Sequence, residues 1–275
     1  MSLDAIQTGI FAVEITPQPT DLIRIVSWNV ARGSRLDEVI KFLRSTNAHV
    51  ICLQEADCNA RRTGYRNIAA EIARALRMNY VFGIEFDELT QGSAECPAYH
   101  GQATLSLFPL TDARILRFRK QSRFWYPYWW FPNLAWLQRR QGGRMALLTN
   151  IHVGQRLLRV YNLHLESRSQ DVRRAQLSEL LEDAHQYDCK TPMIMAGDFN
   201  FDVTEHSATV LFADMCVQNP FNSQRARTTP KDHFGRTGAI DWILVKGPYR
   251  SDSARVHTSI SASDHYPLTV MLEVR

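Results

Sequence analysis

The chain has 275 residues, of which 45% are hydrophobic, and 32 lysines and arginines against 28 aspartates and glutamates give it a net charge of +4. This length and apolar content suit one large domain or two modest ones, and they exclude a chain that needs disulfide staples to fold. The mild positive charge permits a polyanionic partner but does not require one.

The N-terminal sequence and the cysteines bear on where the protein works. The stretch MSLDAIQTGIFAVEITPQPT contains acidic residues and no basic leader, so we expect neither a secretory signal nor a transit peptide. No apolar run is long enough to span a bilayer, so we expect no transmembrane segment. The five cysteines form no CxxC pair, and an odd number cannot close into a complete internal disulfide framework. We therefore expect a reducing, cytoplasmic setting, with Cys52 as a buried free thiol.

Strands and helices alternate in the first third of the chain, after an N-terminal arm over residues 1–21 that we expect to be irregular. Runs rich in β-branched and aromatic residues predict strands at 22–30, 48–57 and 80–86. Apolar residues at helical spacing predict helices at 34–47 and 68–76, and Ser34 can cap the first of them. This rhythm is typical of α/β proteins.

The rest of the chain adds antiparallel pairing. Gly154 and Gln155 separate two strand-like runs and fit a tight hairpin turn. A helix is expected between Ser169 and Tyr187. Further strands are expected at 103–108, 145–153, 156–165, 193–202, 239–245 and 266–274. No repeat or linker divides the chain, so we predict a single mixed α/β domain over residues 1–275, built from layered sheets and helices.

Several of these strands end in polar residues that can bind a metal ion or move a proton. Each alone has an ordinary structural explanation, such as a turn, a cap or a satisfied buried imidazole. Strand ends, however, form the ligand crevices of α/β and layered folds, and converging charges must be paired or bound to metal. We therefore expect a shared site made by Asn29, Glu55, His164, Asp198, Asn200, Asp241, Asp264 and His265.

The chemistry of these side chains is rich in oxygen and free of sulfur. Such a set favours a hard divalent cation, Mg²⁺ or Mn²⁺, over zinc. The histidines follow no HExxH pattern, so they suit proton transfer and charge stabilisation better than metal binding.

The motifs SWN, LQE, NLHLES, GDFN, IDWI and SDHYP, in this order, resemble those of the endonuclease/exonuclease/phosphatase superfamily. The resemblance runs from about Ile23 to the C-terminus and includes HGQATLSLFPL, where Ser106-Leu107 stands in place of the usual Ser-Arg. It implies a four-layer α/β sandwich, with two mixed β-sheets face to face and helices outside. It also implies metal-dependent hydrolysis of a phosphate ester.

The resemblance assigns three residues to the metal ion. Glu55 would be the main metal-binding carboxylate. Asn29 and Asp264 would help directly or through water.

The remaining residues would act on water and phosphate. Asp198, fixed by Asn200, would orient or deprotonate the attacking water. His265, aligned by Asp241, would stabilise charge on the phosphoryl oxygens, or act as the base. His164 would assist the leaving oxygen.

Two features bear on the substrate. Ala56-Asp57 follows LQE where abasic-site endonucleases typically carry Thr-Lys, which argues against that branch. HLES followed by a helix with Arg and Gln is similar to the branch that cleaves tyrosyl-DNA 5′ linkages. We therefore expect a phosphodiester substrate in nucleic acid or a nucleic-acid adduct.

An aromatic segment leaves other functions open. Residues 124–137, FWYPYWWFPNLAWL, lie in a basic-flanked insertion over 119–143. Their composition is that of a membrane-interface anchor, a stacking platform for bases, or a flap packed on the protein itself. One alternative is therefore a phospholipid or sphingomyelin phosphodiesterase that touches membranes through this segment. A second is a non-catalytic binding module on the same fold.

Overall fold

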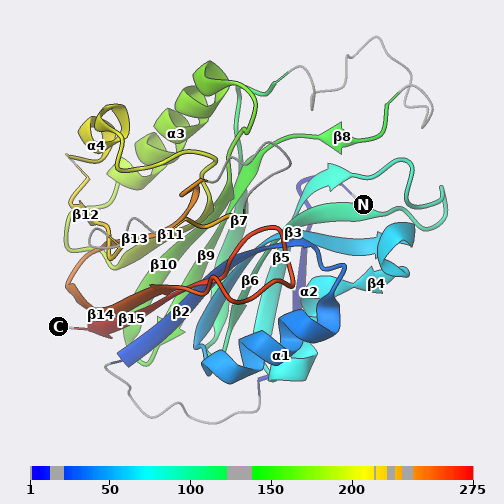
Figure 1. The fold of residues 1–275 in the computed structure, drawn as a ribbon, viewed down its shortest axis with the longest axis horizontal. Coiled ribbons are helices and arrows are strands. Elements are labelled where there is room, and N and C mark those ends of the chain that lie inside the picture. Colours follow the sequence, from blue (N-terminus) through cyan, green and yellow to red (C-terminus); the bar gives the residue numbers. More distant parts are fainter. Residues whose placement is uncertain are drawn as a thin grey trace.

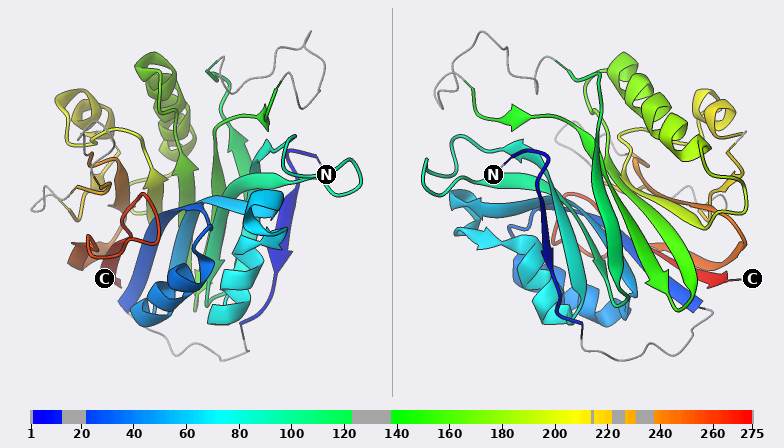
Figure 2. Two further views of the ribbon diagram at one scale, coloured as in Figure 1. Left: turned by 45° about the vertical axis from the view of Figure 1, so that its right-hand side comes forward. Right: turned by 180° about the vertical axis from the view of Figure 1, so that it is seen from behind.

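Two β-sheets stack face to face in the computed structural model, which describes residues 2–12, 22–122, 138–213, 215–221, 227–230 and 238–274. Helices cover the outer face of each sheet, so the expected four-layer α/β sandwich is confirmed (Figures 1 and 2).

The first sheet contains the strands of the N-terminal half and the two last strands of the chain. Its order is β1-β5-β6-β3-β2-β15-β14, with β4 beside β3 and β8 beside β5. The bounds are β1 (Ile6–Gly9), β2 (Leu22–Arg32), β3 (Val50–Ala60), β4 (Arg66–Asn67), β5 (Asn79–Asp87), β6 (Tyr99–Ser106), β8 (Gln141–Gly142), β14 (Tyr249–Val256) and β15 (Leu268–Val274).

The second sheet contains strands from the middle of the chain. Its order is β12-β13-β11-β10-β9-β7. The bounds are β7 (Leu110–Arg117), β9 (Met145–Val153), β10 (Arg156–His164), β11 (Met193–Asp198), β12 (Val217–Gln218) and β13 (Asp241–Lys246).

Amphipathic helices close the two outer layers. The apolar faces of α1 (Leu36–Thr46) and α2 (Ile68–Leu76) pack on the first sheet. The outer face of the second sheet is covered by α3 (Gln170–His185), whose buried leucines belong to the same hydrophobic cluster as residues of this sheet, and α4 (His206–Ala213) lies near it (Figure 1). The buried faces of these helices therefore stabilise the two sheets, and the ends of the sheet strands carry the polar residues.

Most of the expected elements are confirmed, including the hairpin. Strands β9 and β10 pair antiparallel around Gly154, whose φ of +61° suits glycine in a tight turn. The expected helices and strands are present with small shifts of their bounds. Strands β7 and β14 were not expected, because their exposed polar residues hide the alternation typical of strands.

Two local expectations are wrong. Ser34 does not cap α1; its hydroxyl donates to the carbonyl of Ala31, and Arg35 stands at the cap position without a side-chain bond. The N-terminal arm is not irregular throughout, because β1 pairs antiparallel with β5. Backbone hydrogen bonds hold this segment at the edge of the first sheet. Such bonds depend little on side chains, so the sequence pattern does not reveal the strand.

The cysteines differ in part from expectation. Cys52 is a buried free thiol, as expected, and Cys58 and Cys96 are also free. Cys189 and Cys216, however, form a disulfide. Disulfides are typical of oxidising compartments, so this pair gives no support to the reducing, cytoplasmic setting.

The membrane-related expectations bear on different parts of the chain. Across the ranges that the structure describes, no helix is both long and apolar enough to cross a bilayer. The aromatic segment 124–137 lies outside the described residues.

Candidate active site

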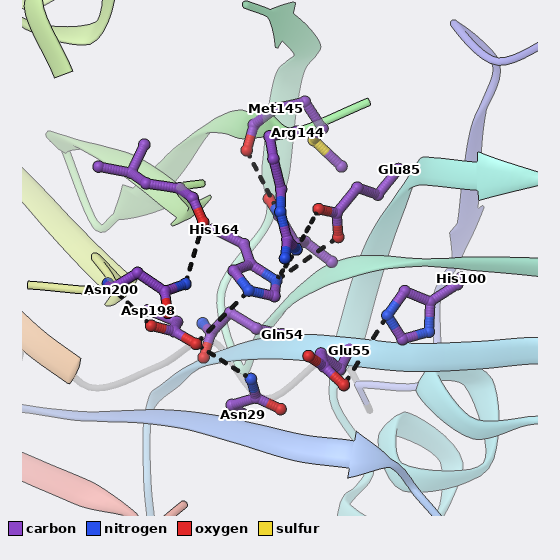
Figure 3. A network of polar contacts seen from close by, with 12 residues as sticks. Asn29, Gln54, Glu55, Glu85, His100, Arg144, Met145, His164, Asp198 and Asn200 are labelled. Carbon is purple, nitrogen blue, oxygen red and sulfur yellow. Dashed lines mark hydrogen bonds and ion pairs between the residues drawn. The ribbon is translucent and has the colours of Figure 1, made fainter. Parts of the chain in front are cut away.

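The strand pairing of the second sheet brings three of the expected residues into one row. In the parallel pair β10 and β11, His164 lies opposite Asp198. In the antiparallel pair β11 and β13, Asp198 lies opposite Asp241. The first sheet faces this row with Asn29 from β2 and Glu55 from β3, two neighbouring parallel strands. Residues far apart in the chain therefore meet at one end of both sheets (Figure 3).

Unusual backbone conformations aim the side chains that end these strands. Glu55 has a φ of +56° where the register of β3 against β6 shifts, so a bulge turns its carboxylate out of the ladder. Asn200 has a φ of +57°, just after β11. Non-glycine residues in this region carry a conformational cost, which proteins often accept at functional sites.

Asp198 is the centre of the polar network and is buried. Its Oδ2 accepts a hydrogen bond from Asn29 Nδ2 at 3.3 Å and lies 3.4 Å from His164 Nε2. The same oxygen is 3.8 Å from His265 Nε2. Its Oδ1 accepts the backbone N–H of Asn200 at 2.9 Å. These donors hold the carboxylate in one orientation, with both histidines on the Oδ2 side.

His164 is held as a single tautomer by an arginine that the sequence analysis missed. Arg144 Nη1 lies 2.8 Å from His164 Nδ1 and 2.7 Å from Glu85 Oε1, and all three side chains are buried. A guanidinium only donates, so Nδ1 must accept and the ring hydrogen resides on Nε2. His164 therefore points an N–H toward Asp198.

His265 is paired with Asp241, as expected. The ring Nδ1 lies 3.0 and 2.9 Å from the two oxygens of the Asp241 carboxylate. Burial disfavours the charged ring, but Asp241 and then Asp198 outweigh it and raise the pKa of His265 to about 10. Burial raises the pKa of Asp241 as well, so the two groups share one proton that the paired carboxylate favours on the ring, with Nε2 directed to the side of Asp198.

Further bonds fix the segment that carries His265. Trp28 Nε1 donates to the His265 carbonyl at 2.9 Å, and Ser263 Oγ donates to the Asn29 carbonyl at 2.6 Å. The hydroxyl of Thr228 accepts the backbone N–H of Asp241 at 3.1 Å. The loop before β15 is thereby tied to β2 and β13, which carry other residues of the site.

Glu55 has the properties of a metal-binding carboxylate. Burial opposes its ionisation, but the basic side chains His100, His164 and Arg144 outweigh this and lower the pKa of Glu55 to about 2. Its side chain keeps 26% of its surface exposed, so the charge faces an accessible space. Asp264 is not brought to Glu55: its carboxylate is exposed and lies 3.2 Å from the hydroxyl of Ser263.

A second group of candidate metal ligands lies beside the first. One ligand atom each from Asp198, Asp241 and His265 fall within 4.8 Å of one another. Carboxylate oxygens are the ligands that hard divalent cations prefer, so the carboxylates of Asp198 and Asp241 fit such an ion.

A family model described as the endonuclease/exonuclease/phosphatase family matches residues 26–265. The chain belongs to this family. Its members are generally divalent-metal-dependent hydrolases of phosphoric esters, and the motifs that carry the sequence resemblance lie on the strands that build the site. No curated protein sequence matches the chain.

Solved structures of the endonuclease/exonuclease/phosphatase fold resemble the whole chain at low identity. A family member from Beutenbergia cavernae is 17% identical with a TM-score of 0.69, covering 92% of this chain and 72% of that one. The human Nocturnin catalytic domain with bound sulfate is 19% identical with a TM-score of 0.67, covering 92% and 94%. A mannosyl-6-phosphatase from Bacteroides thetaiotaomicron is 14% identical with a TM-score of 0.65, covering 91% and 99%.

A cavity of about 500 Å³ opens beside the family motif GDFN. Arg173 and Arg174 of α3 line one wall, and Asp202 and Glu205 lie in the segment after β11. Asn200 also lines it, and its side-chain amide donates to the Leu165 carbonyl at 2.9 Å. The cavity thus adjoins the residues that surround Asp198.

The sequence analysis missed Glu85 and Arg144 in this family site, together with His100 and Asp57 beside Glu55. Glu85 could have been found because it is a charged residue inside an otherwise apolar strand. A charged side chain is rarely buried unless it is paired. Arg144 stands directly before β9 and has no such local signal.

Proposed function

We propose that the protein is a divalent-metal-dependent phosphodiester hydrolase that acts on nucleic acid or a nucleic-acid adduct. The convergence on Asp198 carries the proposal: an amide and two imidazoles lie within 3.8 Å of one carboxylate oxygen, opposite the ionised Glu55. Buried polar groups collected in this way are costly unless they serve binding or catalysis.

The metal would be Mg²⁺ or Mn²⁺, held by Glu55 with help from Asn29. Asp264, exposed at the rim, would contribute through water. When bound, the ion supplies positive charge beside the phosphate and the leaving oxygen.

Asp198 would position the attacking water and take its proton. Its Oδ1 is held by the backbone of Asn200, and Oδ2 lies beside the two imidazoles. A carboxylate fixed in this way can hold one water in line with the phosphorus, and such positioning is the main requirement of phosphoryl transfer.

The two histidines would act on charge rather than as bases. Although burial opposes it, Asp241 and then Asp198 raise the pKa of His265, so the protonated ring is favoured and can neutralise charge on the phosphoryl oxygens. His164 would offer its Nε2 hydrogen to the leaving oxygen, since Arg144 occupies Nδ1.

The cavity beside Asn200, lined by two arginines and two acidic residues, offers room beside the site for a substrate larger than a single phosphate. Two arginines on α3 can contact further phosphates of a chain, as nucleic-acid enzymes require. A structural neighbour is named as a mannosyl-6-phosphatase, so a phosphomonoester is the competing substrate class. Nothing in the described residues adds support to the membrane-lipid alternative.

A metal-dependent activity panel tests the proposal. We would compare bis-nitrophenyl phosphate, single- and double-stranded DNA, a 5′-tyrosyl oligonucleotide, a sugar phosphate, inositol phosphates and sphingomyelin vesicles, each with Mg²⁺, Mn²⁺ or EDTA. We expect turnover of an oligonucleotide substrate that EDTA abolishes. Turnover confined to monoesters or vesicles would overturn the substrate class, and no turnover with any substrate would favour the binding module.

Two variants test the site itself. Glu55→Ala and His265→Ala should each lower kcat/KM by at least about 100-fold. The melting temperature should stay nearly unchanged in Glu55→Ala, whereas His265→Ala also leaves the buried Asp241 without its partner and should lower it. Loss of folding in both variants would instead assign these residues a structural role.

A further inference from the structure

His100 lies on the far side of Glu55 from the catalytic histidines and has no role in the proposed hydrolysis. It comes from β6, where it is the register partner of Asp57 on β3, and only 1% of its surface is exposed. Its Nδ1 lies 2.8 Å from Asp57 Oδ1, and its Nε2 lies 4.0 Å from Glu55 Oε2 (Figure 3). The ring therefore stands between a buried carboxylate and the candidate metal-binding carboxylate.

Asp57 is already neutralised from its other side. Arg62 donates to both of its oxygens, from Nε and Nη2 at 2.7 Å each, and also contacts Glu88. Arg140 Nη2 lies 2.6 Å from the same Glu88. A carboxylate only accepts, so the 2.8 Å contact places a hydrogen on His100 Nδ1, and that hydrogen is donated to Asp57.

The other ring nitrogen, Nε2, lies on the side of Glu55, where it can be offered to a metal ion while Nδ1 keeps its bond to Asp57. Within the described part of the chain, Nε2 of His100 makes no hydrogen bond, and 4.0 Å is too long for one with Glu55. With metal-ligand bonds of about 2.1 Å, one ion reaches both atoms only if it lies nearly between them, in a nearly trans arrangement. A carboxylate that holds the other ring nitrogen is also the usual partner of a metal-binding histidine.

We propose that His100 Nε2 binds the divalent ion directly, together with Glu55, so that the metal site has mixed nitrogen and oxygen ligands. The inference rests on the proposed metal-dependent function and narrows its cofactor. Mg²⁺ strongly prefers oxygen ligands, whereas an imidazole favours transition-metal ions. We therefore expect the site to bind a transition-metal ion more tightly than Mg²⁺, in contrast to the all-oxygen set expected from the sequence, and Mn²⁺ serves as the spectroscopic probe.

The decisive measurement is metal binding to the full chain without substrate. Isothermal titration with Mn²⁺ and with Mg²⁺ should give at least tenfold tighter binding of Mn²⁺ to the wild type. Pulsed electron paramagnetic resonance of the bound Mn²⁺ should show coupling to an imidazole nitrogen. Equal affinities together with the absence of nitrogen coupling would overturn the proposal, and neither result depends on a variant that folds.

Variants then assign the nitrogen. His100→Gln should weaken Mn²⁺ binding by about 10- to 100-fold, change Mg²⁺ binding by less than threefold and remove the nitrogen coupling. The matched control is His152→Gln, because His152 contacts Thr111 at the end of β9 opposite to the site and should leave both affinities unchanged. Nitrogen coupling that persists in His100→Gln would overturn the assignment to His100. Equal losses of Mn²⁺ and Mg²⁺ affinity in His100→Gln would also overturn the assignment, because they would show that His100 only positions Glu55 and does not bind the ion.

These outcomes separate the inference from the proposed function. Mn²⁺ binding with nitrogen coupling, but without turnover of any phosphate ester, would reject the hydrolase and keep His100 as a ligand. Turnover in His100→Gln with unchanged Mn²⁺ affinity would keep the hydrolase and reject the ligand.

Discussion

At the scale of single residues, the site depends on buried charges that are matched in pairs. Asp57 with Arg62, Glu85 with Arg144, and Asp241 with His265 all lie within the distance of an ion pair. Removing one partner of a buried pair leaves the other charge without compensation, which costs far more than an exposed pair contributes. The residues around the site are therefore sensitive to single substitutions in a way that surface charges are not.

Arg144→Met tests this sensitivity. It leaves Glu85, which has no exposed surface, without its guanidinium, so we expect the free energy of unfolding to fall by about 3–5 kcal/mol in urea denaturation. The matched control is Arg66→Met, which breaks the exposed pair with Glu71 and should cost less than about 1 kcal/mol. The double variant Glu85→Met/Arg144→Met should be more stable than Arg144→Met alone; if it is less stable, the buried pair is not the cause.

His49 predicts a pH dependence of stability. Burial and then the charge of Arg24 lower its pKa, and its Nδ1 accepts the backbone N–H of Arg24 at 2.9 Å. The unfolded chain thus binds this proton more readily than the folded chain, so its contribution to stability is complete above about pH 6.5 and is lost as the pH falls below it. Between pH 7.5 and 5.5, the free energy of unfolding should fall less in His49→Gln than in the wild type. Equal falls in the two proteins would contradict this.

At the scale of elements, the site depends on how closely β10 and β11 approach. Gly197 on β11 has a φ of +145°, and a Cβ there would lie 2.0 Å from the Leu163 carbonyl oxygen of β10. The next residues along these two strands are Asp198 and His164, which face each other. The absence of a side chain at Gly197 therefore lets the parallel pair bring the two catalytic candidates together.

Gly197→Ala should separate these strands. We expect a loss of more than about 3 kcal/mol in the free energy of unfolding, and a large loss of kcat, because both backbone strain and a clash arise beside the site. Gly154→Ala is the control: its φ is also positive, but no atom lies within 4 Å of the added methyl group, so it should cost about 1 kcal/mol and leave activity unchanged. Similar activity in the two variants would refute the role given to Gly197.

At the scale of the whole molecule, one covalent link joins two loops of the second sheet. The disulfide between Cys189 and Cys216 connects residues 27 positions apart, ahead of β11 and of β12. Because β11 carries Asp198, the link restrains the loop that leads into a catalytic strand. It lies away from the polar network, so we assign it to stability rather than to chemistry.

Thiol counting tests the link. After denaturation without reductant, three thiols should react, from Cys52, Cys58 and Cys96, and five should react after reduction. Cys216→Ser should lower the free energy of unfolding of the oxidised protein by about 3 kcal/mol, because a loop of this length is no longer closed in the unfolded chain. Five reactive thiols before reduction would show that the pair is reduced under the conditions of the measurement.

The sequence by itself determined the class of fold and most of the candidate site. Alternation with a period of two and helical spacing are local patterns, so they predicted the main strands, the helices and the hairpin at Gly154. Asn29, Glu55, His164, Asp198 and His265 could be found because each one ends an apolar strand.

Only the tertiary structure decided which partners these residues meet. Register across β10, β11 and β13 places Asp198 beside His164 and Asp241, and the bulge at Glu55 turns its carboxylate toward His100. Two residues show the limit of sequence patterns. Arg144 is part of the site although no local pattern predicted it, and Asp264 is exposed although it lies in a family motif. Pairing between strands is a long-range property, whereas the patterns in a sequence report only on neighbours along the chain.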